Sequence, residues 1–290
     1  MKISATVILY NPDEDVFNNV MSYARSVEHI IIVDNSTKHN VSLISKLQNE
    51  LANVIYLNNN NNLGIASALN IGCDKALELG SDWVLTMDQD SSFINFEHYV
   101  NCLHNLSCNK DIALLAGNTV RNAITHLPAN PTCHYEEKFL VITSGNFLNL
   151  SLFNKIGRFE EKLFIDMVDH EYCMKVNQHK YKIYYLKDVL IEHNLGELFQ
   201  RRNLLTGKIR NKIEHSPQRV YYITRNFFYT WKMYSKDFPK EFNLLKTINI
   251  LFIHEMTKIL IYEDQKLKKI GAKFLGLYHF FIGKYGKYDI

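Results

Sequence analysis

Residues 82–92 read DWVLTMDQDSS, an apolar segment followed directly by two aspartates. The part up to Met87 is short and rich in β-forming residues, which predicts a buried strand. Asp88 and Asp90 come at its carboxyl end, and side chains two residues apart in an extended segment point the same way. Two carboxylates on one side repel each other unless a cation or a proton joins them. We therefore expect this strand end to hold a hard divalent cation, Mg²⁺ or Mn²⁺.

Two other structures compete for this aspartate-rich segment. A calcium loop of the EF-hand type does not fit, because Phe93 and Tyr99 stand where that loop needs Gly and Glu. A turn rich in Asp and Ser that caps the following helix stays open as an alternative. The D-x-D spacing alone is a weak signal, and its position at a strand end is what favours a metal site.

The first 120 residues alternate between strand and helix patterns. We expect strands at 3–9, 29–34, 53–57 and 82–87, with helices between them at 14–26, 41–51 and 64–79. This alternation predicts βαβ units, and hence an α/β fold with a mostly parallel sheet flanked by helices. Ligands of such sheets bind beyond the carboxyl ends of the strands. The polar residues at those ends are Tyr10 and Asn11, Asp34 to Ser36, Asn58 to Asn62, and Asp88 to Asp90.

The pattern changes beyond residue 139. Residues 139–150 predict a strand and a turn, 158–176 a loop that enters a helix, and 181–193 one or two strands. From about residue 217 the chain reads as helical to its end. We therefore expect an α/β domain over residues 1–215 and a helical extension over residues 216–290 that packs on it.

Composition excludes several classes of protein. The 290 residues are 47% hydrophobic and 22% charged, which is typical of a globular protein and excludes disorder, a collagen repeat and a disulfide-stapled miniature scaffold. Five cysteines without a CxxC spacing favour reduced thiols over a disulfide framework or a structural zinc site. The N-terminus does not have the form of an export signal, and no stretch approaches a membrane span. We expect a cytoplasmic protein.

The charges are distributed unevenly along the chain. Residues 201–290 hold 18 Lys and Arg against 7 Asp and Glu, whereas residues 1–200 hold 15 against 23. This asymmetry predicts an acidic body that uses a cation and a basic C-terminal region that faces something anionic. Solvated helix faces are the alternative for any single lysine.

A second group of ionisable residues lies further along the chain. Asp166 and Asp169 are three apart in a helical stretch, so we expect them to share a face. Asp169 lies among apolar residues and is a candidate general base, whereas Asp166 suits a helix cap. His193 closes a strand-like segment and could ligate a metal held by the carboxylate pair, although a single histidine is more often structural.

Residues 62–72, NLGIASALNIG, place small residues at the start of a helix. Free backbone N–H groups at such a helix start favour an anion such as a diphosphate. The glycines do not form GxGxxG and no GxxxxGK[ST] occurs, which argues against a nicotinamide-binding Rossmann site and a P-loop NTPase.

These motifs, in this order, resemble family 2 glycosyltransferases, and within them the bacterial rhamnosyltransferases of O-antigen and capsule assembly. The residues that carry the resemblance are Tyr10-Asn11, VDNS (33–36), NLGIASALNIG (62–72), LTMDQDS (85–91), the segment 143–175, and IEHNLGE (191–197). The similarity extends from residue 3 to about residue 235. It implies the GT-A fold, a nucleotide-sugar transferase domain with a metal site.

The resemblance also implies roles for individual residues. Tyr10, Asn11 and Asp34 would hold the base and ribose, Asn62 and Asn70 would line the nucleotide site, and Ser144, Gly145 and Asn146 would border the sugar or acceptor. Asp88, Asp90 and His193 would hold the metal, with Asp88 also beside the nucleotide. Asp169 matches the catalytic base. Val168 stands where many members have Glu, which leaves Asp166 as a rival base.

The implied reaction is inverting transfer of a sugar, with L-rhamnose from dTDP-L-rhamnose as the expected donor and a UDP-hexose (galactose or glucose) as the alternative. The implied acceptor is a lipid-linked saccharide of lipopolysaccharide or another cell-surface polysaccharide, whose diphosphate Arg201, Arg202, Arg219 and Arg225 would bind. Surface solvation is the alternative role for these arginines. No nucleic-acid partner is expected.

Two other classes of protein are compatible with parts of the pattern. A nucleotidyltransferase also pairs a parallel sheet with Asp-bound Mg²⁺, but it usually carries a Gly-rich basic loop where this chain has Tyr10-Asn11-Pro12-Asp13. A binding module without catalysis is disfavoured by the intact acidic residues and His193.

The C-terminal segment 273–288, KFLGLYHFFIGKYGKY, has apolar residues at helical intervals. Lysines flank this apolar pattern at positions 268, 269, 273, 284 and 287. This composition, together with the lipid-linked acceptor that the resemblance implies, predicts a helix in peripheral contact with an anionic membrane, on the inner face of the plasma membrane. A terminal helix packed on the catalytic domain is the alternative.

Overall fold

The computed structural model describes residues 1–120, 130–193, 198–202, 207–243 and 247–290. The chain forms two compact units, each with its own interior. The first consists of Met1–Glu161 and Asp169–Asn194, and the second of Lys162–Val168 and Leu195–Ile290. The sequence placed a boundary at residue 215, whereas here the second unit already includes residues 195–215.

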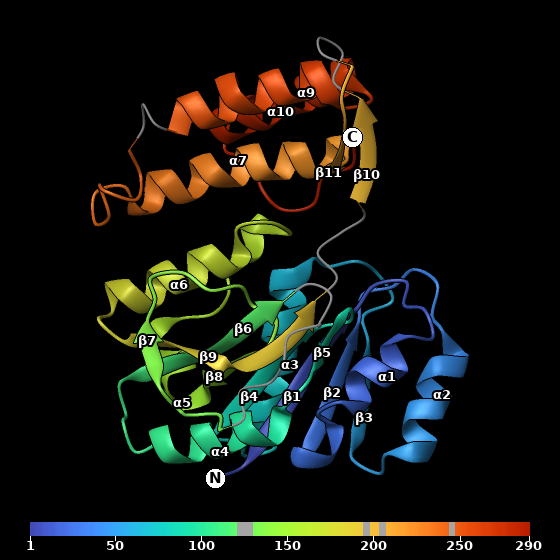
Figure 1. Ribbon diagram of the computed structural model, residues 1–290, viewed down its shortest axis with the longest axis vertical. Helices are drawn as coiled ribbons and strands as arrows, with labels where there is room; N and C mark the ends of the chain where they lie inside the picture. Colours follow the sequence, from blue (N-terminus) through green and yellow to red (C-terminus); the bar gives the residue numbers. More distant parts are fainter. Residues whose placement is uncertain (121–129, 194–197, 203–206, 244–246) are drawn as a thin grey trace. The chain divides into compact units, whose positions relative to one another are not determined.

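The first half of the sheet in the first unit is parallel (Figure 1). Its strands follow the spatial order β3-β2-β1-β4, and all three pairings are parallel. The strands are β1 (Ile3–Leu9), β2 (His29–Asp34), β3 (Val54–Asn58) and β4 (Trp83–Asp88), connected through α1 (Val16–Met21), α2 (Val41–Glu50) and α3 (Ile65–Glu78). The predicted strand–helix alternation is confirmed. β1 is buried along its whole length, as a parallel sheet covered by helices on both faces requires.

The second half of the sheet is mixed. β8 (Asn146–Asn149) pairs antiparallel with both β4 and β6 (Ile112–Val120), and β9 (Lys182–His193) pairs parallel with β6. The edge strands β5 (Ser91–Phe93) and β7 (Tyr135–Glu137) both run antiparallel to β9. Residues 181–193, which predicted one or two strands, form the single long strand β9. Helices α4 (Phe96–Leu106), α5 (Leu150–Ile156) and α6 (Val168–Gln178) complete the unit.

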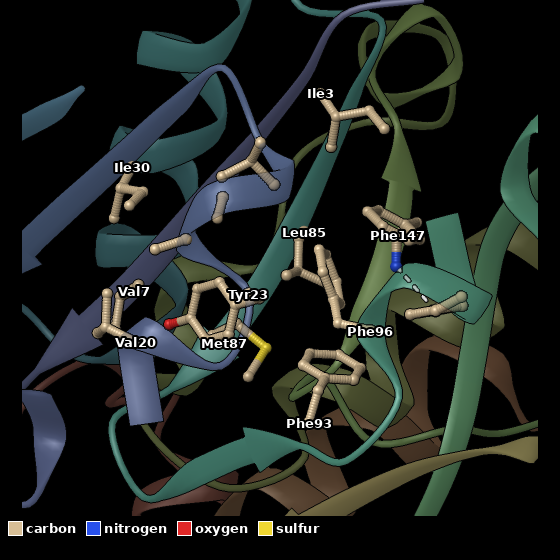
Figure 2. Close-up of a cluster of buried hydrophobic side chains, with 14 of the residues drawn as sticks. Ile3, Val7, Val20, Tyr23, Ile30, Leu85, Met87, Phe93, Phe96 and Phe147 are labelled. Carbon is tan, nitrogen blue, oxygen red and sulfur yellow. Dashed lines mark hydrogen bonds between the residues drawn. The ribbon is translucent and has the colours of Figure 1, made fainter. Parts of the chain in front are cut away.

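An aromatic cluster lies in the core beside the end of β4 (Figure 2). The rings of Phe93 and Phe96 are 4.7 Å apart between centroids, and those of Tyr99 and Phe147 are 4.5 Å apart. Such ring pairs contribute about 0.5–1.5 kcal/mol each beyond the burial of their area. Because Phe93 belongs to β5, this packing anchors the segment that directly follows Asp88 and Asp90.

The sequence-based expectation that all five cysteines are reduced is wrong for two of them. Cys102 and Cys133 form a disulfide, while Cys73, Cys108 and Cys173 are free. The two partners are 31 residues apart in sequence, so no local spacing indicated the bond. They meet because Cys102 lies on α4 and the chain returns past that helix before it enters β7.

The second unit is mainly helical. It begins with a hairpin of β10 (Leu198–Arg202) and β11 (Ile209–Ile213), followed by α7 (Pro217–Tyr234), the π-helix η3 (Asn249–His254), α9 (Glu255–Tyr262) and α10 (Lys266–Phe281). Helices α7 and α10 approach closely at Gly276, where an added Cβ would lie 2.7 Å from the carbonyl oxygen of Tyr221. Among the described residues, no helix combines the length and the apolar content needed to cross a bilayer.

Candidate active site

The sheet brings two aspartates and a histidine together. Asp88 is the last residue of β4, and Asp90 follows in the turn that leads to β5. The antiparallel register of β5 and β9 places Ser91 opposite His193. Ligand atoms of Asp88, Asp90 and His193 consequently lie within 4.8 Å of one another, with 3.9 Å between His193 Nδ1 and Asp90 Oδ1.

A chain of hydrogen bonds holds this group in position. The backbone N–H of Asp88 donates to Ser144 Oγ at 3.0 Å, and the Ser144 hydroxyl donates to Ser91 Oγ at 2.8 Å. Ser91 Oγ lies 2.5 Å from His193 Nδ1. A hydrogen bond at one ring nitrogen orients the imidazole and determines which nitrogen is free for a ligand. Ser91 was not identified from the sequence, although its position directly after D-x-D was a usable signal.

The electrostatics of the site favour a bound cation. Burial, together with smaller contributions from the nearby carboxylates of Asp90 and Asp169, raises the pKa of Asp88 to about 7. A divalent cation beside Asp88 would stabilise its ionised form, which burial and the neighbouring carboxylates disfavour. The two carboxylates are donors that suit Mg²⁺ or Mn²⁺, and the imidazole nitrogen favours Mn²⁺, the softer of the two. The residues present therefore fit the expected metal.

Asp169 lies in the first turn of α6, where the helix dipole stabilises negative charge. Its Oδ1 accepts a hydrogen bond of 2.8 Å from the backbone N–H of His170. The carboxylate lines a small pocket together with Thr86, Thr143 and Asn146, and its charge reaches Asp88. A carboxylate in this position can accept a proton from a hydroxyl group bound nearby.

Asp166 does not share a helical face with Asp169, and that prediction is corrected. Helix α6 begins only at Val168, and Asp166 lies before it with a φ of 64°. Its carboxylate forms an ion pair with Arg219 inside the second unit. A left-handed backbone for a residue other than glycine ends the helical pattern that the i, i+3 spacing suggested.

Asp34 is fully buried at the end of β2. Its carboxylate accepts hydrogen bonds from the Ser36 backbone N–H (2.8 Å), the Tyr56 hydroxyl (2.7 Å) and His39 Nδ1 (2.9 Å). Burial alone would raise the pKa of Asp34, but these hydrogen bonds outweigh it and hold the pKa below its usual value. Asp34 is therefore an ionised acceptor near neutral pH. Tyr56 and His39 were not identified from the sequence, because β3 and the turn after β2 meet only in the folded sheet.

The loop after β1 is held by the residue between the two aspartates. Gln89 Oε1 accepts a hydrogen bond of 2.8 Å from the backbone N–H of Tyr10, while its Nε2 donates to the Tyr10 carbonyl. The backbone N–H of Asn11 donates to Ser36 Oγ at 2.7 Å, and Asn11 has a φ of 48°. The side chains of Tyr10 and Asn11 are exposed, so both are available to a ligand.

The two asparagines of segment 62–72 have different surroundings. Asn62 is half-buried, and its Oδ1 accepts from the backbone N–H of Gly64 directly before α3. Asn70 is buried, and its amide donates to the Phe159 carbonyl and to Glu161 Oε1. Both amide hydrogens of Asn70 are thus used within the protein, where they fasten α3 to the segment before α6.

The turn Ser144-Gly145-Asn146 lies beside the end of β4 at the start of β8. Gly145 has a φ of +82°, and an added Cβ would lie 2.2 Å from the side chain of Ile191. A residue with a side chain is therefore excluded here. The amide of Asn146 donates to the Ile142 carbonyl, and its side chain lines the same pocket as Asp169.

Arg225 does not lie where the sequence-based expectation placed it, and its role as an anion ligand is corrected. It is fully buried on α7 within the second unit. Its guanidinium donates to the hydroxyl of Tyr221 and to the carbonyls of Gly286, Lys162 and Leu163. Helical periodicity turns this arginine inward, and its N–H groups already have acceptors in the protein.

The other three candidate arginines also belong to the second unit. Arg201 is bound by Glu214, to which its Nε donates at 2.6 Å. Arg219 forms the ion pair with Asp166. Arg202 is exposed, so it stays a candidate for an acceptor phosphate.

In sequence, the chain is similar to known glycosyltransferases. The model of glycosyl transferase family 2 matches residues 10–97. The chain is 29% identical to the dTDP-rhamnosyl transferase RfbF of Shigella flexneri over 248 residues, which are 78% of this chain and 78% of that protein.

Two solved structures are similar in fold. GalNAc-T7, crystallised with UDP, GalNAc and Mn²⁺, superposes with a TM-score of 0.63 at 12% identity over 83% of this chain and 50% of its own. Residues 1–349 of S. aureus TarS, crystallised with UDP-GlcNAc, superpose with a TM-score of 0.53 at 15% identity. This match covers 100% of the present chain and 94% of the TarS chain. Half of the GalNAc-T7 chain thus lies outside the match. At these identities the likeness shows the fold alone, which is the GT-A type of α/β fold.

Proposed function

Because the chain belongs to glycosyltransferase family 2, whose members are inverting transferases that use nucleotide sugars, we propose that it transfers L-rhamnose from dTDP-L-rhamnose onto a glycan. The cluster of Asp88, Asp90 and His193 with Asp169 nearby is the observation that carries the reaction type. The choice of donor is supported by the relative from Shigella flexneri, which is named a dTDP-rhamnosyl transferase. Membership of this family removes the nucleotidyltransferase alternative.

Asp88, Asp90 and His193 would hold Mg²⁺ or Mn²⁺, and the chemistry supplied there is neutralisation of the charge on the departing nucleoside diphosphate. Ser91 and Ser144 keep the histidine and the Asp88 backbone in register with each other. The N-terminus of α3 offers backbone N–H groups to the same diphosphate.

Asp169 takes the proton from the acceptor hydroxyl, whose oxygen then attacks the anomeric carbon from the side opposite the leaving group. Attack by the acceptor itself, without a covalent sugar–enzyme intermediate, inverts the configuration, as in hydrolases with one general base. Asp166 is the less suitable base, because its carboxylate is neutralised by Arg219.

The base and ribose of the donor would lie against Tyr10, Asn11 and Asp34. The buried, ionised carboxylate of Asp34 is an acceptor suited to a pyrimidine N–H, and it is oriented by Tyr56. Asn62 lies at the edge of this region, and the turn from Ser144 to Asn146 borders the sugar or the acceptor.

We further propose that the acceptor is a lipid-linked saccharide in the assembly of O-antigen or another lipopolysaccharide. Such an acceptor places the enzyme in the cytoplasm, in peripheral contact with the inner face of the plasma membrane. Arg202, which is exposed, is the candidate ligand for the lipid diphosphate.

A UDP-hexose is the second candidate donor, because both similar structures were crystallised with UDP or a UDP-sugar. A panel separates the two: the purified chain is incubated with Mn²⁺ and dTDP-L-rhamnose, UDP-galactose or UDP-glucose, and slow release of nucleoside diphosphate is measured. We expect the fastest release from dTDP-L-rhamnose. Faster release from a UDP-hexose would mean that this sugar nucleotide, and not dTDP-L-rhamnose, is the donor. If none of the three is hydrolysed, the proposed reaction is contradicted.

A further inference from the structure

Helix α10 carries its large apolar side chains on the outside. Four of these side chains follow one line along the helix. Their successive spacings are seven, four and three residues, and at 100° per residue each spacing returns to nearly the same side of the helix. This outer stripe consists of Leu267 (86% exposed), Phe274 (54%), Tyr278 (57%) and Phe281 (74%). At 1.5 Å per residue, the stripe from Leu267 to Phe281 is about 21 Å long.

The opposite face of α10 is buried and contains charged and small residues. Lys269 Nζ donates to Glu263 Oε2 at 2.9 Å, and Lys273 Nζ donates to Glu255 Oε2 at 2.9 Å. Both lysines are almost fully buried. The sequence suggested that they face anionic headgroups, and that expectation is wrong for these two.

The rotation of α10 about its axis is therefore determined by specific partners. Turning the apolar stripe inward would remove both buried lysines from their carboxylates and leave charges unpaired, which is strongly unfavourable. Gly276 also allows close packing on α7 only in this orientation. The outward stripe is thus a built feature of the unit rather than the result of loose packing.

A neighbouring segment extends the apolar surface. The ring of Phe252 in η3 lies 6.2 Å from that of Phe274, and the next residue, Ile253, is 62% exposed. A contiguous exposed apolar surface of this kind indicates contact with a partner or a membrane.

The charges around the stripe favour an anionic partner. Three acidic residues of this region are paired within the unit: Glu255 and Glu263 with the buried lysines, and Asp264 with Arg201. Lys268, next to Leu267, is exposed, and so are Lys284 and Lys287, which follow the C-terminal end of α10.

A second copy of the chain is a poorer partner for this surface. An isologous interface would bring the exposed lysines of one copy against those of the other. The anionic headgroups and acyl boundary of a phospholipid bilayer match both the lysines and the apolar side chains.

We propose that α10 docks on the surface of an anionic phospholipid bilayer. The helix lies in the plane of the interface, with Leu267, Phe274, Tyr278 and Phe281 in the acyl boundary. Lys268, Lys284 and Lys287 lie at the level of the headgroups. The full chain attaches reversibly in this way, and the attachment does not depend on which nucleotide sugar the enzyme uses.

Cosedimentation of the full chain with vesicles tests this proposal. Vesicles of phosphatidylcholine with 30% phosphatidylglycerol are compared with pure phosphatidylcholine, at low salt and at 0.5 M NaCl. We expect binding to the anionic vesicles only, weakened by salt because the attraction is screened. Phe274→Ser with Phe281→Ser should abolish binding, and Lys268→Gln or Lys287→Gln should each weaken it by about fivefold.

The matched control is Val41→Ser, which removes an equally exposed apolar side chain (71%) from the first unit and should bind like the unaltered protein. Far-UV circular dichroism of every variant verifies folding. Equal sedimentation of the Phe274/Phe281 variant and the control would overturn the proposal. So would a lipid-free dimer, seen by analytical ultracentrifugation, that the same two substitutions dissociate.

Discussion

At the scale of single residues, the site depends on small hydroxyl groups as much as on carboxylates. Ser91 contacts His193, and Ser144 connects Ser91 to the backbone of Asp88. Partners of this kind orient a metal ligand and are typically worth 10- to 100-fold in metal affinity.

Ser91→Ala should weaken Mn²⁺ binding by about tenfold, because His193 loses the hydrogen bond that orients its ring. The measurement is a titration of Mn²⁺ monitored by its electron paramagnetic resonance signal. Ser92→Ala, one residue away and facing the other side of β5, is the control and should leave Mn²⁺ affinity unchanged. Equal affinities for both variants would mean that Ser91 has no part in the site.

Asp169→Asn keeps the shape of the side chain but removes its ability to accept a proton. We expect kcat to fall by about 10²–10⁴-fold, while the Kd of the donor stays close to that of the unaltered enzyme. Asp166→Asn is the comparison, because its carboxylate is already paired with Arg219. If Asp166→Asn loses transfer and Asp169→Asn retains it, the base has been assigned to the wrong carboxylate.

At the scale of elements, helix α7 holds the segment that leads into α6. Asn226 donates to the carbonyls of Leu163, Ile165 and Asp166, next to the bonds that Arg225 makes. Three residues of this segment have left-handed backbones without being glycine: Phe164, Asp166 and Met167. Each such residue costs about 1–3 kcal/mol and persists only where its surroundings hold it.

Arg225→Met should lower the free energy of unfolding of the second unit by about 3 kcal/mol, since it leaves several buried carbonyls without donors. The chain has two tryptophans, and only Trp231 belongs to this unit. In a Trp83→Phe background, guanidinium denaturation followed by fluorescence therefore reports the second unit. Arg202→Met, at an exposed position, should change the free energy of unfolding little. An equal loss of this free energy in both variants would show that the hydrogen bonds of Arg225 do not stabilise the second unit.

The contact of the hairpin with α10 should depend on pH. Burial alone would raise the pKa of Glu214, but hydrogen bonds from Lys269 and Arg201 outweigh it and lower the pKa. A carboxyl whose folded pKa is depressed stabilises the fold above its unfolded pKa, about 4.3, and loses that contribution as the pH falls through the folded value. We expect the Trp231 transition to weaken below about pH 4.5, and Glu214→Gln to flatten this dependence. If the pH dependence of the Trp231 transition is the same in Glu214→Gln as in the unaltered protein, Glu214 is not the group responsible.

At the scale of the whole molecule, the predicted ligand site and the apolar stripe belong to different units. The metal cluster, Asp169 and Asp34 lie in the first unit, and α10 lies in the second. Ligand binding and lipid binding can therefore be measured separately, each with its own tryptophan.

Mn²⁺ together with dTDP should stabilise the first unit, because a ligand that binds only the folded state adds about 2.7 kcal/mol at 100 times its Kd. The thermal transition of Trp83, read in a Trp231→Phe background, should shift upward with both ligands and less with dTDP alone. Asp90→Ala should abolish the additional shift due to Mn²⁺, whereas Asp111→Ala, on the surface, should preserve it. A Mn²⁺ effect that survives in Asp90→Ala would place the metal elsewhere.

Local patterns were sufficient for the first half of the fold. The strands up to β4 and the helices between them follow from the period of apolar residues, because burial in a parallel sheet requires short runs that are apolar on both faces. The position of Asp88 and Asp90 at a strand end follows from the same pattern. These properties depend on residues that are neighbours in the chain, so they could be predicted without the structure.

Other properties depend on which distant segments of the chain meet, and these became visible only in the folded protein. Ser91 and His193 are 102 residues apart and become partners through the β5–β9 register. Arg225 and Lys273 looked like surface cations, yet the helices turn both inward, where acceptors more than 15 residues away bind them. A charge can be buried only where such acceptors compensate for lost hydration, and their location is a property of the packed chain.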